Sequence, residues 1–300
     1  MRYAEHDRGC KPSTIRDYRS TIRAHLLPAF GPMRVEDIDA ATIERWRAGL
    51  PSTLSPRTKN KLLIQLHGVF RRAQKVYALP RNPMADIERH RQRPSGDIAV
   101  FSVEEVLALV RAAESMQDAA LYMTAAFTGL RRGELLALRW RDVDFEASAI
   151  RVRASYSGGA LTMPKSGRVR SVPLAPDVGR VLAELGQREH FASDDDLVFA
   201  GEAGGYLDGS ALRRRYDRAL NRAGLRPLRF HDLRHTFGTR MIARADIRRV
   251  QEWMGHSDVQ TTMKYLHYVP RHDDAALVAD DFRSARFLDA STVTDRRRTG

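Results

Sequence analysis

The chain has 300 residues and a formal net charge of +13, with 50 lysines and arginines against 37 acidic residues. This length allows two domains, and the charge indicates a polyanionic partner. The single cysteine, Cys10, excludes an intrachain disulfide and a cysteine-based metal cage. Since the first residues hold no apolar signal-peptide core and no later run approaches the roughly 20 apolar residues that span a bilayer, we expect a cytoplasmic protein with no membrane partner.

The positive charge is concentrated in the first third of the chain. Residues 1–93 hold 19 Lys and Arg against 9 Asp and Glu, residues 94–270 hold 25 against 22, and residues 271–300 hold 6 against 6. Such an excess is expected of a domain that grips a phosphate backbone.

The first predicted domain, residues 1–93, is all-helical. A helix that follows Ser13 and ends at Pro28 carries one apolar stripe, formed by Ile15, Tyr18, Ile22 and Leu26. A shorter helix over residues 41–48 ends at Gly49.

A longer helix begins at Ser55, an N-cap followed by Pro56 at the first helical position. Its predicted apolar stripe is formed by Leu62, Leu66, Val69, Phe70, Ala73 and Tyr77. We predict DNA contacts from a set of basic side chains on this helix and just beyond it: Arg57, Lys59, Lys61, Arg71, Arg72, Lys75, Arg91 and Arg93. The alternative is a solvated face without a partner.

Apolar periodicity vanishes over residues 88–98, which are predicted to form a basic linker that crosses DNA. Ser102 and Glu105 have the spacing of a capping box, so a second domain over residues 98–289 is predicted to begin here. Gly129 is expected to end a further helix at Thr128.

Residues 149–174 change to the period of strands. Outward arginines alternate with Ile150 and Val152, Gly158 and Gly159 supply a turn, and a basic return strand carries Val169 and Val172. This pattern predicts a small antiparallel sheet with Lys165 at its tip. The expected fold is therefore mainly α with a small antiparallel β-sheet (α+β).

Helices resume after the sheet. They are predicted over residues 210–223 with Gly224 as terminator, from His231, over residues 246–254, and from Val259, the last one carrying Tyr265. Residues 290–300 are predicted to be a disordered tail.

Five motifs follow one another in the second half of the chain: Thr128-Gly129-Leu130-Arg131-Arg132-Gly133-Glu134-Leu135, Pro164-Lys165-Ser166-Gly167, His231-Asp232-Leu233-Arg234-His235-Thr236, Gly255-His256-Ser257 and Thr261-Thr262-Met263-Lys264-Tyr265-Leu266-His267. Two guanidiniums can clamp the non-bridging oxygens of a phosphodiester, because each planar fork donates parallel hydrogen bonds and keeps its charge. Arg131 and Arg234 are the predicted pair, and Arg132 is a rival to Arg131 that spacing does not exclude.

Tyr265 is the predicted nucleophile, ahead of Tyr268, because only Tyr265 has the Thr-Thr-x-x-Tyr-x-His setting. A phenol with an ordinary pKa of about 10 needs help to lose its proton. His231 can give that help, since it lies three residues before Arg234 on one side of a helix.

The remaining motif residues have predicted supporting roles. Lys165 is the candidate general acid for a departing 5′-oxygen, and His256 would bond the scissile phosphate. Glu134 and Asp232 would orient the arginines and the histidine.

The sequence raises two cofactor hypotheses, a zinc ion and a nucleotide. His231 and His235 have the spacing of a helical zinc pair, but Asp232 stands where the metalloprotease signature has glutamate. Positive side chains can already neutralise a phosphate, and the sequence holds no phosphate-binding loop, so we expect neither a metal nor another cofactor.

The ordered set of motifs resembles the tyrosine recombinase (phage integrase) family over nearly the whole chain. The resemblance implies a two-domain DNA clamp with a SAM-like amino-terminal domain, and a 3′-phosphotyrosine intermediate. Its catalytic set falls on Arg131, Lys165, His231, Arg234, His256 and the nucleophile Tyr265.

The resemblance also implies partners. It predicts a double-stranded DNA recombination site, a homo-tetramer on two duplexes, accessory DNA-bending or directionality factors, and a helix over residues 272–288 that is lent to a neighbour. Within this family we favour the integrase of a phage or mobile element. The alternatives are a recombinase that resolves chromosome dimers, a type IB topoisomerase and an inactive DNA-binding relative.

Overall fold

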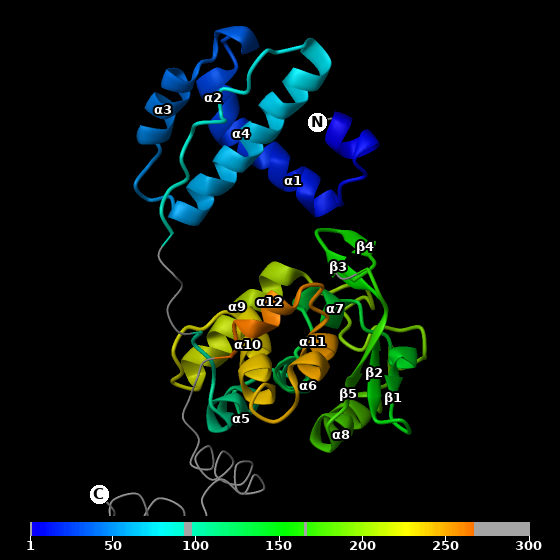
Figure 1. Cartoon of the computed structure of the whole chain (residues 1–300). Coiled ribbons are helices and arrows are strands. Elements are labelled where there is room, and N and C mark those ends of the chain that lie inside the picture. The colour runs from blue at the N-terminus through cyan, green and yellow to red at the C-terminus, as the bar shows by residue number, and fades with distance from the viewer. Residues whose placement is uncertain (1, 93–97, 165–166, 267–300) are drawn as a thin grey trace, which may run out of the picture.

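The protein is described by a computed structural model, in which residues 2–92, 98–164 and 167–266 are placed. Helices dominate, and the small sheet lies to one side of the second domain (Figure 1). The predicted fold class, mainly α with a small antiparallel sheet, is confirmed. The predicted tail at 290–300 and the predicted helix at 272–288 lie outside the described residues. Among the described residues, no helix is both long enough and apolar enough to cross a membrane.

Within residues 2–92 the α-helices are α1 (Pro12–Thr21), α2 (Leu27–Phe30), α3 (Ala40–Ala48) and α4 (Pro56–Tyr77). The prediction that Pro28 ends the first helix is wrong, because the helical backbone continues to Phe30. A π-helical turn, Ile22–Leu26, joins α1 to α2, and Pro28 falls in the first turn of α2. In a first turn the N–H that proline lacks has no helical partner to lose.

Helix α4 begins as predicted, with the Ser55 side chain accepting a hydrogen bond from the Thr58 N–H at 3.2 Å. Its buried apolar stripe is formed by Leu62, Leu63, Leu66, Phe70 and Ala73. Two residues assigned to that stripe are exposed instead, Val69 and Tyr77. Val69 lies at the edge of the stripe, and Tyr77 is the last helical residue, beyond the core that the other helices cover.

The start of the predicted linker is fixed to α4. The buried Asn60 side chain donates to the His90 carbonyl at 2.8 Å and accepts from the His90 N–H at 2.7 Å. Both polar groups of the amide are thereby satisfied, and the chain is held against the first helices as far as residue 90.

The second part of the chain holds α5 (Val103–Arg111), α6 (Met116–Thr128), α7 (Arg132–Leu136), α8 (Pro176–Leu185), α9 (Gly209–Arg222), α10 (Phe230–Met241), α11 (Ile247–Met254) and α12 (Val259–Met263). The predicted capping box forms at the start of α5, between Ser102 and Glu105. Helix α6 is buried nearly all round, and its Tyr122 packs edge-on against Tyr216 of α9, with ring centroids 5.4 Å apart. Buried apolar side chains of this kind supply most of the stability of such a core.

In the described part of the chain, five strands form two sheets rather than the single one expected. A three-stranded antiparallel sheet has the order β1 (Val143–Asp144), β2 (Ala149–Val152), β5 (Arg170–Pro173), and a separate hairpin pairs β3 (Ser155–Ser157) with β4 (Ala160–Thr162). In the larger sheet Ile150 faces Val172, and both are fully buried. Val169, predicted with Val172 for the return strand, precedes β5 and is exposed.

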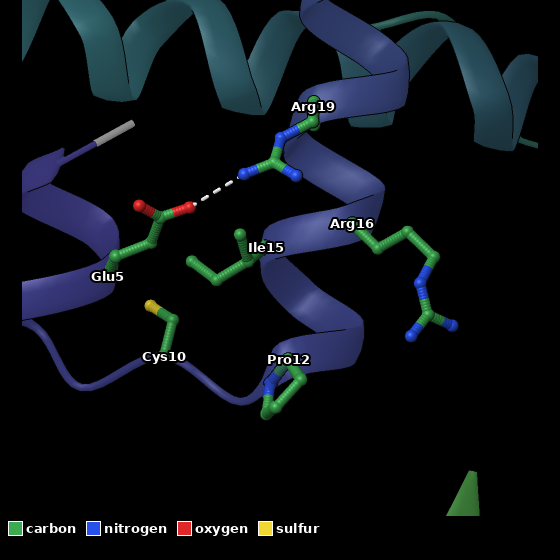
Figure 2. Close-up of a pocket in the computed structure, with 6 residues that line it drawn as sticks. All are labelled: Glu5, Cys10, Pro12, Ile15, Arg16 and Arg19. Atoms are coloured by element: carbon green, nitrogen blue, oxygen red, sulfur yellow. Dashed lines mark hydrogen bonds and ion pairs between the residues drawn. The ribbon is translucent and has the colours of Figure 1, made fainter. Parts of the chain in front are cut away.

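The β3–β4 hairpin contacts the first helices. The Arg16 guanidinium of α1 donates to the carbonyl of Gly158 at the hairpin turn, at 2.7 Å. Figure 2 shows this side chain pointing away from the neighbouring Glu5–Arg19 ion pair, which is 3.0 Å long and lines a shallow pocket with Cys10. No motif residue lines that pocket.

Gly129 fixes the end of α6 and the entry to the arginine motif. Its φ of +64° is left-handed, and its N–H bonds the Ala125 carbonyl at 3.2 Å. A Cβ at this position would collide with the Phe237 ring of α10. Only glycine therefore allows α6 to end here while α10 packs closely against it.

We predict that Gly129→Ala lowers the free energy of unfolding by roughly 1–3 kcal/mol from the backbone alone, with a further loss from the displaced Phe237. Gly68→Ala is the control, because Gly68 lies inside α4 with open space around it. That change should raise stability by up to about 1 kcal/mol. Chemical unfolding of both variants checks the pair, and equal effects of the two changes would contradict this account of Gly129.

Candidate active site

The motifs converge where the carboxyl ends of α6 and α11 meet the amino-terminal half of α10. The structure brings Arg131, Arg234, His256 and Tyr265 together, with His231 beside them. Lys165 lies outside the described residues.

Arg131 is the N-cap residue of α7 and is held in place by Glu134. The Arg131 backbone N–H donates to Glu134 Oε2 at 2.9 Å, and its Nη1 donates to Oε1 at 3.0 Å. Its Nη2 donates to the Gly255 carbonyl at 3.0 Å. The rival Arg132 is exposed and lies beside Gly209 at the start of α9. Arg131, and not its neighbour, therefore faces the other motifs.

Arg170 of β5 completes this group and was not predicted. Its two terminal nitrogens donate to the two oxygens of Glu134 at 3.0 and 2.7 Å, and its Nε donates to the Trp253 carbonyl at 2.9 Å. The Glu134 side chain has no exposed surface. Burial by itself would raise the pKa of Glu134, but Arg170 and Arg131 outweigh it and hold that pKa below its usual value.

Arg234 is almost completely buried, with 2% of its surface exposed, in the first turns of α10. Its guanidinium donates to two main-chain carbonyls, Gly129 at the end of α6 and Met254 at the end of α11, the latter at 2.6 Å. Among the described residues no carboxylate pairs with it. Burial and the charge of Arg131 lower its pKa to about 9, so the side chain is still a cation at neutral pH.

The site therefore holds an excess of buried positive charge. Among the described residues, the guanidiniums of Arg131 and Arg170 pair with one carboxylate, that of Glu134, and Arg234 pairs with none. Main-chain carbonyls accept further hydrogen bonds from all three arginines without cancelling their charge. Such a cluster suits an incoming anion with several oxygens, and a phosphodiester is one.

His256 joins this cluster through both ring nitrogens. Its Nε2 lies 2.8 Å from Arg234 Nη2, and its Nδ1 lies 2.8 Å from Thr262 Oγ1. Arginine can only donate, so Nε2 is the acceptor and Nδ1 carries the proton. Burial, followed by the charges of Arg234 and Arg131, lowers the pKa of His256 to about 3, and the ring is neutral.

Tyr265 is 5% exposed and packs with Phe237, Val250 and Met254. It lies two residues beyond α12, so the prediction that this helix carries it is wrong, although its N–H still bonds the Thr262 carbonyl at 3.0 Å. Its ring rests on Gly238 of α10, where a Cβ would lie 2.8 Å from the ring carbon that bears the hydroxyl.

His235 is the second residue that the sequence did not assign to the site. Its Nδ1 lies 2.8 Å from the hydroxyl of Tyr265. The ring of His231 meets the ring of His235 edge-on, with centroids 4.9 Å apart. Burial, followed by the charges of His235 and Arg234, lowers the pKa of His231 to about 4.

Asp232 is held by Arg229. Its carboxylate accepts from the Arg229 N–H at 2.7 Å and from Arg229 Nη2 at 3.0 Å. This is the capping box at the start of α10, the helix that carries His231 and Arg234. The role of Asp232 in orienting the site residues stays a prediction.

The basic residues predicted on α4 fall into two groups. Three of them contact groups of the first helices: Lys59 donates to the Leu50 carbonyl, Lys61 pairs with Asp17, and Arg72 lies over the ring of Tyr3. The others on this helix are exposed, namely Arg57, Arg71 and Lys75, as is Arg91 further along. Arg93 lies outside the described residues.

Among the described residues, no group of three or more histidine, cysteine or acidic side chains is arranged to hold a metal ion. His235, half of the hypothetical zinc pair with His231, points its Nδ1 at a tyrosine hydroxyl.

The model of the phage integrase family matches residues 99–272, and that of the phage integrase N-terminal SAM-like domain matches residues 3–50. A protein named tyrosine recombinase XerC-like from Caldanaerobacter subterraneus is 30% identical over 68% of this chain and 57% of its own length. Tyrosine recombinase XerC of Xanthomonas axonopodis is 34% identical over 58% of this chain and 55% of its own. The chain thus spans little more than half the length of these two relatives.

Two solved structures share the fold. The Tn1549 transposon integrase in complex with transposon right end DNA has a TM-score of 0.76 at 20% identity, covering 93% of this chain and 96% of that one. A lambda integrase dimer bound to a COC′ core site has a TM-score of 0.72 at 19% identity, covering 88% of this chain and 94% of the other.

We predict that Glu134→Gln lowers the free energy of unfolding by about 3 kcal/mol or more at neutral pH, because two arginines lose their buried counter-charge. The effect should shrink in acid. Since the pKa of Glu134 is lowered by folding, its contribution is complete above the unfolded-state value of about 4.3 and is lost as the pH falls through the folded value.

Chemical unfolding at a series of pH values measures this difference. The exposed Glu146→Gln is the matched control and should change stability by less than about 0.5 kcal/mol. A constant difference between wild type and Glu134→Gln at every pH would show that the carboxylate charge is not what stabilises the site.

Proposed function

Since this chain belongs to the phage integrase family, we propose that it is a site-specific DNA recombinase that cuts and rejoins DNA through a 3′-phosphotyrosine intermediate. The observation that carries the proposal is the group formed by the buried Arg234 and the partly buried Arg131 and Arg170, in excess over carboxylates among the described residues, beside the buried Tyr265. The arginines supply charge for a phosphodiester, and the tyrosine supplies the nucleophile.

We assign the reaction as follows. The hydroxyl oxygen of Tyr265 attacks the scissile phosphorus and the bond to the 5′-oxygen breaks. Arg131 and Arg234 stabilise the charge that grows on the non-bridging oxygens. The proposed bond from His256 to the same phosphate requires the imidazole to change partners, because Nε2 accepts from Arg234 and Nδ1 faces Thr262 in this structure. Lys165 protonates the departing 5′-oxygen. The covalent link conserves the energy of the cut bond, so rejoining needs no nucleotide.

The partner in this proposal is a duplex DNA recombination site, and the active assembly is a homo-tetramer on two duplexes with accessory DNA-bending or directionality factors. The division into a domain over residues 1–93 that grips DNA and a catalytic domain over residues 98–289 belongs to the same proposal. The exposed basic residues of α4 support this division. Their positive charges can contact a phosphate backbone, and α4 is distant in sequence from the catalytic motifs.

Two biological roles are consistent with this chemistry. The likeness to the Tn1549 transposon integrase and the lambda integrase supports the integrase of a phage or mobile element. The relatives named XerC support the second candidate, a cellular recombinase that resolves chromosome dimers. Incubation with nicked duplexes tiled across the genomic flanks of the gene, followed by denaturing electrophoresis, tests the chemistry that both require. A covalent adduct supports it, and its absence on every duplex contradicts it.

We predict that Tyr265→Phe keeps the DNA affinity of the wild type and forms no covalent adduct, because it lacks the attacking oxygen and keeps the packed ring. Tyr268→Phe is the control and should still form the adduct. Gel-shift titration measures binding, and denaturing electrophoresis followed by peptide mapping locates the linkage. A linkage mapped to Tyr268 would reassign the nucleophile.

A separate prediction concerns Lys165. An alkoxide leaves slowly without a proton, whereas the thiolate released from a 5′-bridging phosphorothiolate hardly needs one. Lys165→Ala should therefore cleave ordinary DNA about 100-fold or more slowly and recover most of that loss on the sulfur substrate. Arg131→Ala should recover far less, because it lacks charge stabilisation and not a proton donor. Single-turnover cleavage rates on both substrates make the comparison, and equal defects of Lys165→Ala on both would exclude it as the acid.

A further inference from the structure

Among the residues that the structure describes, the hydroxyl of Tyr265 has one titratable side chain within hydrogen-bond distance, that of His235. The two atoms, Tyr265 Oη and His235 Nδ1, are 2.8 Å apart, and the ring centroids are 5.7 Å apart. His231, the residue expected to take the proton, contacts the ring of His235 instead. From this geometry, and resting on the proposed function, we propose that His235 is the general base that accepts the proton of Tyr265 during strand cleavage.

The fold fixes this pair with little freedom. Gly238 lies three residues after His235, so both face the same side of α10. The tyrosine ring fills the space that a Cβ on Gly238 would occupy, and Met254 of α11 also reaches that position. The ring is thus held against α10 at the height that brings its oxygen to Nδ1 of His235.

The surroundings set the protonation states that a base needs. Burial lowers the pKa of His235. The charge of Asp232 raises that pKa, whereas the charges of Arg229, Arg234 and Lys264 lower it further. The imidazole is therefore neutral and can accept a proton. Burial raises the pKa of Tyr265, partly offset by Arg234 and Arg131, so the phenol holds its proton until a phosphate is in place. The proposal uses the tautomer of neutral His235 that has its proton on Nε2, in which Nδ1 accepts a hydrogen bond from the Tyr265 hydroxyl.

The proton balance of the step is complete. The bond from Tyr265 Oη to phosphorus forms and the bond from phosphorus to the 5′-oxygen breaks. The phenolic proton passes to Nδ1 of His235, and the leaving oxygen takes a different proton, which we assign to Lys165. On rejoining, the imidazolium of His235 returns its proton to the tyrosine oxygen as that oxygen leaves phosphorus.

The test compares two replacements of His235 that differ in whether the new side chain can accept a hydrogen bond from Tyr265. In His235→Asn an amide oxygen near the place of Nδ1 can accept the hydrogen bond but cannot take the proton, and His235→Ala can do neither. Both should form the covalent adduct at least about 100-fold more slowly than the wild type, with unchanged DNA affinity. The exposed His190→Gln is the control and should match the wild type. A wild-type rate for His235→Asn would show that the residue only positions the tyrosine and would overturn the proposal.

A second measurement changes the nucleophile. Tyr265 is replaced by a difluorotyrosine with fluorine on both carbons next to the one that bears the hydroxyl, which ionises more readily and needs a base less. The defect of His235→Asn should then shrink at least about tenfold, while that of His231→Gln should persist. Rescue of His231→Gln in place of His235→Asn would overturn the assignment, as would no rescue of either.

If His235→Asn does not fold, His235→Gln is measured in its place. We expect the same slow cleavage from it and the same rescue by difluorotyrosine. Absence of an adduct from the wild type on every duplex overturns the proposed function and this inference with it. A wild-type adduct together with unimpaired His235 variants overturns this inference alone.

Discussion

The site depends on positive charge that the protein itself does not neutralise. Among the described residues, Arg131 and Arg170 pair with the carboxylate of Glu134, whereas the more deeply buried Arg234 has two main-chain carbonyls and a neutral histidine as its partners. Buried charge without a counter-ion is costly, so the arrangement stores a strong attraction for an anion. The same charge helps keep His256 and His231 neutral and partly offsets the effect of burial on Tyr265. The excess of positive charge therefore attracts the phosphate, helps keep the histidines neutral and lowers the pKa of the nucleophile relative to burial alone.

The fold maintains this imbalance with the carboxyl ends of two helices. Helix α6 directs the Gly129 carbonyl at Arg234, and α11 directs the carbonyls of Trp253, Met254 and Gly255 at the three arginines. The negative end of a helix dipole stabilises a cation without supplying a full charge that would compete with a phosphate. Left-handed glycines end both helices, and close contacts of Gly129 with Phe237 and of Gly255 with Arg170 leave no room for a side chain. The glycine conformations that end the two helices therefore also place the carbonyls that contact the arginines.

Much of the site could be predicted from sequence because its motifs coincide with helix ends, where capping residues and glycines are recognisable. Arg131 and Arg234 were found in this way. Arg170 was missed because arginine is common throughout the chain. The signal that could have found it is its position on the same strand face as the buried Val172, because an arginine that points inward needs a carboxylate partner, here Glu134. His235 was assigned only to a metal alternative, because its true partner is 30 residues away and the contact depends on how α12 packs. The continuation of the first helix past Pro28 also follows from local geometry that periodicity does not report.

The central claim is that the arginines act by neutralising the scissile phosphate. The most direct measurement replaces one non-bridging oxygen of that phosphate with a methyl group, which removes its negative charge and keeps its shape. Rates of adduct formation are then compared for the wild type, Arg131→Ala and Arg234→Ala on both substrates. The account predicts defects of about 100-fold or more on ordinary DNA that largely disappear on the neutral methylphosphonate. Equal defects on both substrates would contradict it, because the arginines would then serve structure or binding and not the charge of the phosphate.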